Sequence, residues 1–147
     1  MKLTVAWIGK TKSAALQSLT DEYLKRLRQY AETEGISLKD EPALLKSCGR
    51  DGRGARRRLV LLDPGGKQLS SEELAKFLAD HQDQNPVPLV FAVGLPDGFR
   101  ETARQQADFT LSLGKMTIAH ELARVLLLEQ LYRGFTILKG HPYHLGH

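Results

Sequence analysis

The sequence predicts an α/β protein in which helices flank a mostly parallel sheet. Three short runs, residues 3–8, 59–62 and 89–93, are apolar at nearly every position. Such runs are typical of strands that are buried on both faces. Segments with helical periodicity separate them, and this alternation of strand and helix favours parallel pairing. At 147 residues the chain has the length of one domain, which we expect to span 1–147.

The composition favours an anionic partner and a reducing compartment. Twenty-one Lys and Arg residues against 17 Asp and Glu residues give a net charge of +4. The single cysteine, Cys48, excludes an internal disulfide, which fits the cytoplasm. No apolar run approaches the length of a membrane span, and residues 3–8 are too short for a secretion signal. We therefore expect a cytoplasmic protein without a membrane partner.

The first helix is expected to begin after Ser13, a favourable N-cap residue. Apolar residues recur at helical spacing from Leu16 to Tyr30, and Gly35 is expected to end the helix. Residues 36–38 then predict a short strand.

Residues 46–58 (KSCGRDGRGARRR) change the character of the chain. They contain three glycines and five arginines and almost no apolar side chain, which indicates a mobile loop. One interpretation is a solvated surface loop. The other is an arm that contacts phosphate groups, since the guanidinium fork of arginine fits phosphate geometry.

A second helix is predicted close after the strand at 59–62. Ser70 and Glu73 have the spacing of a capping box, which marks its first turn. Pro86 and Pro88 then bound the strand expected at 89–93.

The C-terminal part combines residues typical of a core with residues typical of a site. Residues 109–113 predict a short strand, and 118–133 predict a helix that is apolar on nearly every face. Such a helix belongs in an interior or between subunits. It also contains Glu129 and Arg133, which are spaced for a helical ion pair.

Three predicted strands end in glycine-containing loops, at 63–66, 94–98 and 113–117. Ligands of open α/β sheets bind beyond the carboxyl ends of the strands, and glycine lets a ligand approach the backbone closely. Glycines that merely make turns are the alternative. Neither a dinucleotide fingerprint nor a P-loop is present. The small, apolar loops suit a flat heterocycle better than a polyphosphate.

With these motifs in view, the whole chain resembles the RlmH family of small SPOUT-class methyltransferases. The resemblance is most specific in GLPDG (94–98), in LSLGKMTIAHELARVLLLEQLYR (111–133) and in GHPYH (140–144). It implies an α/β fold with a C-terminal trefoil knot, S-adenosylmethionine as cofactor, and a homodimer. It also implies methylation of N3 of a pseudouridine in 23S ribosomal RNA, in the assembled ribosome, with no DNA partner.

The resemblance also implies which residues form the site. The cofactor is expected to contact Leu62, Gly94, Leu113, Gly114, Lys115, Met116, Thr117 and Ile118. Because N3 must lose its proton, nearby cations and hydrogen-bond donors are the catalytic candidates. These candidates are Arg124, Arg133, His141, Tyr143 and His144, with His144 or Tyr143 expected to handle the proton.

Two other hypotheses remain open at this point. The chain can be a non-catalytic ribosome-binding or RNA-binding module that has the same fold. It can also be a metal-binding regulator that uses His141, His144 and His147, although no nearby carboxylate or cysteine supports this spacing, and we predict no metal site.

Overall fold

The computed structural model describes residues 1–84 and 87–145. Its sheet has five strands in the order β2-β1-β4-β3-β5, and every pairing is parallel. The strands are β1 (Lys2–Ile8), β2 (Glu32–Leu38), β3 (Arg58–Gln68), β4 (Leu89–Val93) and β5 (Phe109–Ser112). The predicted fold class is therefore confirmed. The trefoil knot and the homodimer stay predictions.

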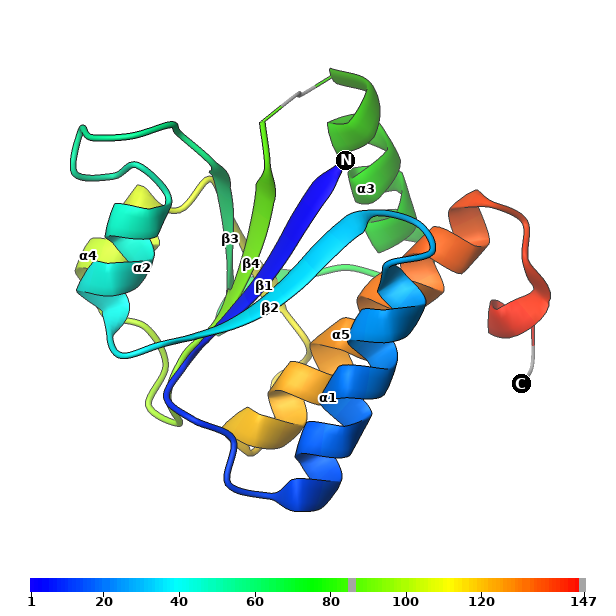
Figure 1. The fold of residues 1–147 in the computed structure, drawn as a ribbon, viewed down its shortest axis with the longest axis horizontal. Coiled ribbons are helices and arrows are strands. Elements are labelled where there is room, and N and C mark those ends of the chain that lie inside the picture. Colours follow the sequence, from blue (N-terminus) through cyan, green and yellow to red (C-terminus); the bar gives the residue numbers. More distant parts are fainter. Residues whose placement is uncertain (85–86, 146–147) are drawn as a thin grey trace.

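Helices cover both faces of the sheet. They are α1 (Ala14–Leu27), α2 (Glu41–Ser47), α3 (Ser71–Gln84), α4 (Glu101–Gln106) and α5 (His120–Leu138), followed by a short 3₁₀ helix, η1 (Pro142–His144). Figure 1 shows α1, α3 and α5 on one face and α2 with α4 on the other. Side chains of a strand alternate between these faces, so Val5 and Phe91 pack toward α5 while Ala6 and Ala92 pack toward α2 and α4.

The position of α5 explains why it is apolar on nearly every face. The helix packs beside α1 and α3 over the sheet (Figure 1), and Leu127, Leu128 and Leu131 are completely buried. The prediction that this helix lies in an interior is confirmed within a single chain. Two leucines of the same helix, Leu122 and Leu126, keep 41% and 38% of their surface exposed.

The predicted end of the first helix was wrong. Helix α1 begins after the Ser13 cap as expected, but it ends at Leu27, and Gly35 lies inside β2. A Cβ atom at Gly35 would lie 2.8 Å from side-chain atoms of Leu24 and of Trp7. This glycine is therefore required by close packing, and it does not stop a helix.

The structure differs from the sequence-based expectation at two further places. Helix α2 was not predicted, although Asp40 caps it by accepting a hydrogen bond from the backbone of Ala43 at 2.9 Å. The loop at 63–66 does not end its strand, because β3 continues to Gln68 after a shift of register against β5. At Gly66 a Cβ would lie 2.7 Å from the backbone of Thr110, so only glycine lets the two strands lie this close.

Other local predictions were accurate. The Ser70 hydroxyl accepts a hydrogen bond from the Glu73 backbone at 3.0 Å, and the Glu73 carboxylate accepts one from the Ser70 backbone at 2.8 Å, which confirms the capping box. Strand β4 has the predicted bounds, whereas Pro86 lies outside the described residues. Within residues 1–84 and 87–145, no helix has the length and hydropathy needed to cross a membrane.

Candidate functional site

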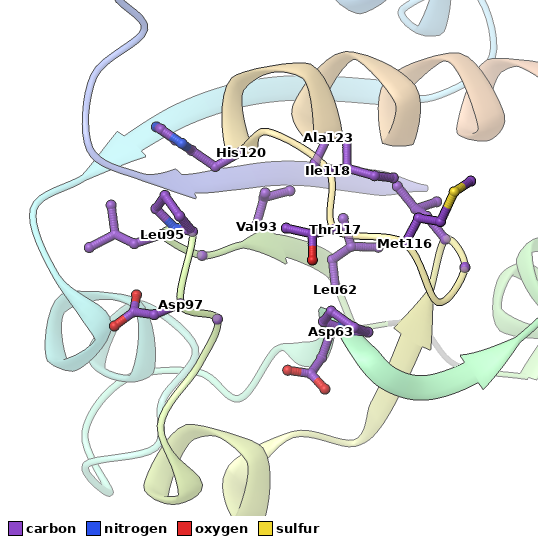
Figure 2. A pocket seen from close by; sticks show the side chains of 16 residues that line it. Leu62, Asp63, Val93, Leu95, Asp97, Met116, Thr117, Ile118, His120 and Ala123 are labelled. Atoms are coloured by element: carbon purple, nitrogen blue, oxygen red, sulfur yellow. The ribbon is translucent and has the colours of Figure 1, made fainter.

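A pocket lies beside the ends of β4 and β5 and the irregular middle of β3, at the carboxyl edge of the sheet (Figure 2). It contains about 730 Å³ of space, part of which opens to solvent. Of the eight predicted cofactor residues, seven line it: Leu62, Gly94, Leu113, Gly114, Met116, Thr117 and Ile118. The eighth, Lys115, is exposed and does not line the pocket. The structure thus brings together the three loops that the sequence indicated.

Glycines shape two of these loops. Gly98 has a φ of 79° and closes a tight turn in which its N–H donates to the carbonyl of Leu95 at 2.8 Å. Gly114 has a φ of 138°, and its N–H donates to the Ser112 hydroxyl at 3.0 Å. A Cβ at Gly94 would lie 3.2 Å from the ring of Phe99, so a larger side chain there would displace the ring or enter the pocket.

The sequence analysis missed three polar residues of the pocket, Asp63, Asp97 and His120. Both aspartates lie in stretches that the sequence indicated, Asp63 within β3 and Asp97 shortly after β4, and their place in these stretches was the available signal. Asp63 accepts a hydrogen bond from the backbone of Gly65 at 2.9 Å and lies 3.8 Å from the Arg104 guanidinium. None of the described residues that line the pocket is Lys or Arg. Two carboxylates without a lining cation favour a cationic ligand and oppose a polyphosphate.

A second constellation forms around Glu129, at the middle of α5. Its carboxylate accepts hydrogen bonds from Arg133 Nε and from the Tyr143 hydroxyl, both at 3.0 Å. Arg133 Nη1 donates to His144 Nδ1 at 3.1 Å, and His144 Nε2 lies 2.8 Å from the Glu72 carboxylate. The guanidinium of Arg133 also stacks 4.9 Å from the ring centre of Tyr143. We call these five residues the Glu129 network.

The Glu129 network fixes the protonation of its members. The hydrogen bond to Glu129 raises the pKa of Arg133, which stays a cation. Burial, together with hydrogen bonds to Tyr23 and Glu129, raises the pKa of Tyr143, so its hydroxyl stays protonated and acts as a donor. Because Arg133 can only donate, His144 Nδ1 accepts, and Nε2 carries the proton toward Glu72.

Two further catalytic candidates lie outside the Glu129 network. Arg124 is only 1% exposed, and its guanidinium donates to the Thr11 hydroxyl at 3.0 Å and to the carbonyl of Ile8 at 2.9 Å. Burial lowers the pKa of Arg124. Arg124 therefore fastens α5 to the segment after β1. His141 Nδ1 forms a short hydrogen bond with the hydroxyl of Tyr30.

The terminal histidines do not converge in the described part of the chain. His141 contacts Tyr30, whereas His144 contacts Arg133 and Glu72. Among residues 1–84 and 87–145, no group of three or more His, Cys, Asp or Glu residues is placed to hold a metal ion. His147, the third ligand of the metal hypothesis, lies outside the described residues.

The pocket lies at the amino end of α5, whereas the Glu129 network lies along the middle and second half of the helix. His120 lines the pocket from the first position of the helix, and Arg133 follows 13 residues later. With a rise of 1.5 Å per residue, these two positions are about 20 Å apart along the helix axis. One chain therefore does not bring both groups of residues to a single small substrate.

Comparison with known proteins identifies the family. Residues 1–144 match the family model described as "Predicted SPOUT methyltransferase". The chain belongs to the SPOUT methyltransferase family. Within this family, it is 59% identical over 147 residues to a protein of Koribacter versatilis named Ribosomal RNA large subunit methyltransferase H, with both chains fully covered. A Gloeobacter violaceus protein of the same name is 40% identical over 154 residues, covering 99% of this chain and 100% of that one. The resemblance predicted from the sequence is thus confirmed.

Two solved structures share the fold. One is the ribosomal RNA small subunit methyltransferase E of Neisseria gonorrhoeae bound to S-adenosyl methionine, with a TM-score of 0.52 and 14% identity, covering 94% of this chain and 66% of that one. Another is a probable methylase family protein of Haemophilus influenzae, with a TM-score of 0.59 and 11% identity, covering 96% of this chain and 69% of that one. At such identities the similarity concerns the fold alone.

Proposed function

We propose that this SPOUT methyltransferase transfers the methyl group of S-adenosylmethionine to N3 of a pseudouridine in 23S ribosomal RNA, and that it acts as a homodimer. The names of its full-length relatives support a large-subunit ribosomal RNA substrate. The S-adenosyl methionine bound to a protein of the same fold supports the cofactor. The intact, open pocket favours an active enzyme over a non-catalytic RNA-binding module.

The charge of the pocket is the observation that carries the cofactor assignment. S-adenosylmethionine has a positive sulfonium and an ammonium group, and Asp63 and Asp97 are the acidic residues among those that line the pocket. Its adenine is a flat heterocycle, which suits the apolar wall of Leu62, Leu113 and Ile118. A Cβ at Gly114 would meet nothing within 4 Å, so a ligand can approach the backbone of this loop closely.

When bound, the cofactor supplies an electrophilic methyl group. The nucleophile is N3 of the base, which has to lose its proton before or during attack, while the C–S bond breaks to leave a neutral thioether. The Arg133 cation can stabilise the negative charge that develops on the imide. The imidazole of His144 can take up the proton at Nδ1, once the base displaces the hydrogen bond from Arg133. Tyr143 stays protonated, and its hydroxyl donates to Glu129, which holds the carboxylate that binds Arg133.

A dimer would join the two halves of the site. About 15 Å of α5 separates Ala123, which lines the pocket, from Arg133 within one chain, so a dimer in which the pocket of one subunit faces the Glu129 network of the other would bring them together. Leu122 and Leu126 are exposed near the pocket end of α5 and are suited to an interface between subunits.

The test has two parts. Calorimetric titration with S-adenosylhomocysteine should show saturable binding of one ligand per subunit. The protein is then incubated with ribosomes that lack the methyl group and with S-adenosylmethionine whose methyl group carries tritium. The labelled methyl group should appear on N3 of one pseudouridine of 23S RNA. Binding without transfer, in a protein shown to be folded and dimeric, would favour the non-catalytic module. Transfer to another atom or another RNA would contradict the proposed specificity.

A further inference from the structure

The positive charge of this protein is concentrated in one segment that lies away from the pocket. Residues 46–58 contain six of the 21 Lys and Arg residues and one of the 17 Asp and Glu residues, a net charge of +5. The rest of the chain, with 15 basic and 16 acidic residues, has a net charge of −1. An RNA-binding protein needs cations to neutralise phosphates, and here the excess of cations over anions lies in this segment.

Between the end of α2 at Ser47 and the start of β3 at Arg58, the base of this segment's loop is held by hydrogen bonds. The side chain of Arg50 is only 2% exposed and clamps the base of the loop. Its Nη1 donates to the carbonyls of Cys48 at 2.8 Å and of Arg57 at 2.9 Å, which joins the two ends of the loop. Its Nε donates to the carbonyl of Gln106 at 3.0 Å, and its Nη2 pairs with Asp108 at 2.7 Å.

Asp108 connects this clamp to the sheet. Its carboxylate also accepts a hydrogen bond from the backbone of Leu59 in β3 at 2.8 Å and pairs with Arg56 at 2.8 Å. Arg50 is therefore a structural residue, while Arg56 keeps 63% of its side chain exposed despite its ion pair. A loop whose ends are fixed loses less conformational entropy when it binds a ligand.

The tip of the loop presents arginines beside open backbone. All residues from 51 to 56 are exposed, and no described residue bonds to the side chain of Arg53. Gly52 and Gly54 have φ values of 77° and 75°, and a Cβ at either position would meet nothing within 4 Å. The absence of side chains at these positions leaves room for a phosphate backbone to approach the two neighbouring guanidinium groups.

The loop and the pocket lie at opposite edges of the sheet. In Figure 1 the loop projects from the upper left, between α2 and the start of β3. Leu62, four residues along β3 from Arg58, already lines the pocket. At about 3.3 Å per residue, this part of the strand alone separates the two by about 13 Å. A nucleotide bound at the pocket therefore does not reach the loop, which has to contact other nucleotides.

We propose that the loop formed by residues 49–57 is a preformed phosphate-binding arm, which holds the backbone of the substrate RNA through Arg53 and Arg56 at a distance from the methylated base. The inference rests on the proposed function, because it takes ribosomal RNA as the partner. An RNA backbone is favoured over a lipid surface because the tip has no apolar side chain larger than Ala55 that could insert between lipids.

The experiment compares matched charge removals. Binding to an unmodified 23S RNA transcript is measured by fluorescence anisotropy between 50 and 300 mM salt for the wild type, for the double variant Arg53→Gln/Arg56→Gln, and for Lys25→Gln/Lys76→Gln. The control removes two exposed lysines from α1 and α3. The arm variant should bind at least about tenfold more weakly at 100 mM salt, with the slope of log K against log salt reduced by about 1.4 to 1.8. The control should change affinity less than about twofold.

Two added measurements separate the possible failures. Arg53→Lys/Arg56→Lys should recover most of the salt slope, and S-adenosylhomocysteine affinity should be unchanged in all variants. Wild-type affinity and slope in the glutamine variant would overturn the arm while leaving the proposed function intact. Binding of the glutamine variant to phosphatidylserine vesicles is also compared with that of the wild type. Weaker vesicle binding together with normal RNA binding would also overturn the proposed arm. Failure of the proposed function looks different, because the wild type itself would then transfer no methyl group to ribosomal RNA.

Discussion

At its amino end, α5 borders a pocket lined mainly by glycines and apolar residues with a few polar ones, whereas in its second half it contributes Glu129 and Arg133 to a network of charged and aromatic side chains. Shape and the lining residues define the first region. Hydrogen bonds between charged groups define the second. The difference suggests a division of labour in which one end holds the cofactor and the other prepares the base for attack. Substitutions at the two ends should then change different measurable quantities.

Filling the pocket should have the largest effect. Thr117 is exposed, and in Figure 2 its side chain points into the pocket, so Thr117→Trp would occupy the cavity without disturbing the core. We expect S-adenosylhomocysteine affinity to fall by more than about 100-fold, since a filled site excludes the ligand. Calorimetry measures this loss. Lys115→Trp, two residues away and outside the pocket, is the matched control and should bind normally. Normal binding by Thr117→Trp would place the cofactor elsewhere.

Removing the cation of the Glu129 network should change turnover and leave cofactor binding nearly intact. Arg133→Ala should lower kcat for ribosome methylation by about 100-fold or more, because the developing charge on the base loses its stabilising group. S-adenosylhomocysteine affinity should stay within a few fold of wild type. Lys139→Ala, an exposed cation just beyond α5, is the control and should be nearly as active as wild type. If Arg133→Ala lost cofactor binding and turnover to the same extent, the two regions of α5 would not have separate roles.

The separation of the two ends depends on α5 being firmly packed. Leu127, about midway between them, is completely buried against the sheet, so Leu127→Ala should lower the free energy of unfolding by about 3 kcal/mol. Leu19→Ala, at a position that is 44% exposed on α1, should cost less than about 1 kcal/mol. Urea unfolding of both variants gives the comparison. If both variants lowered the free energy of unfolding by the same small amount, α5 would be packed less firmly than the structure shows.

The smallest effect concerns the attachment of the pocket end of α5. The Glu121 carboxylate accepts hydrogen bonds from the backbones of Ser13 at 3.0 Å and Lys12 at 2.8 Å, and these lower its pKa from 4.5. A carboxyl group with a lowered folded-state pKa stabilises the fold above about pH 4.5, and this contribution is lost as the pH falls through the folded-state value. Glu121→Gln should therefore lower the urea midpoint slightly at pH 7 and reduce its decline between pH 5 and pH 3. If the urea midpoint of Glu121→Gln declined between pH 5 and pH 3 as much as that of the wild type, the Glu121 carboxylate would not stabilise the fold in this way.

The pocket was largely predictable because its signals are local. Glycines after consecutive strands indicated loops at one edge of the sheet, and the structure places Gly94 and Gly114 together in the pocket there. Asp63 and Asp97 lie in the same stretches of sequence, but nothing local showed that their carboxylates would reach the rim. The capping box at Ser70 was equally local, and it was found with its correct partner.

The parts that could not be predicted depend on contacts between distant residues. Glu72 reaches His144 from 72 positions earlier in the chain, so the tail composition alone did not indicate it. Arg50 was assigned to a mobile loop because its neighbours are glycines and arginines, yet Asp108, 58 positions away, orders it. Gly35 was taken as a helix stop, although packing against Trp7 requires it. In each case tertiary contacts overrode the local signal.

Mixing two inactive variants tests most directly whether the pocket and the Glu129 network act across subunits. Thr117→Trp and Arg133→Ala chains are unfolded, combined in equal amounts and refolded, and methyl transfer to unmodified ribosomes is measured. If each active site joins the pocket of one subunit to the Arg133 of the other, half of the dimers contain one intact site, and about a quarter of wild-type activity should return. Activity no higher than that of either variant alone would contradict the shared site.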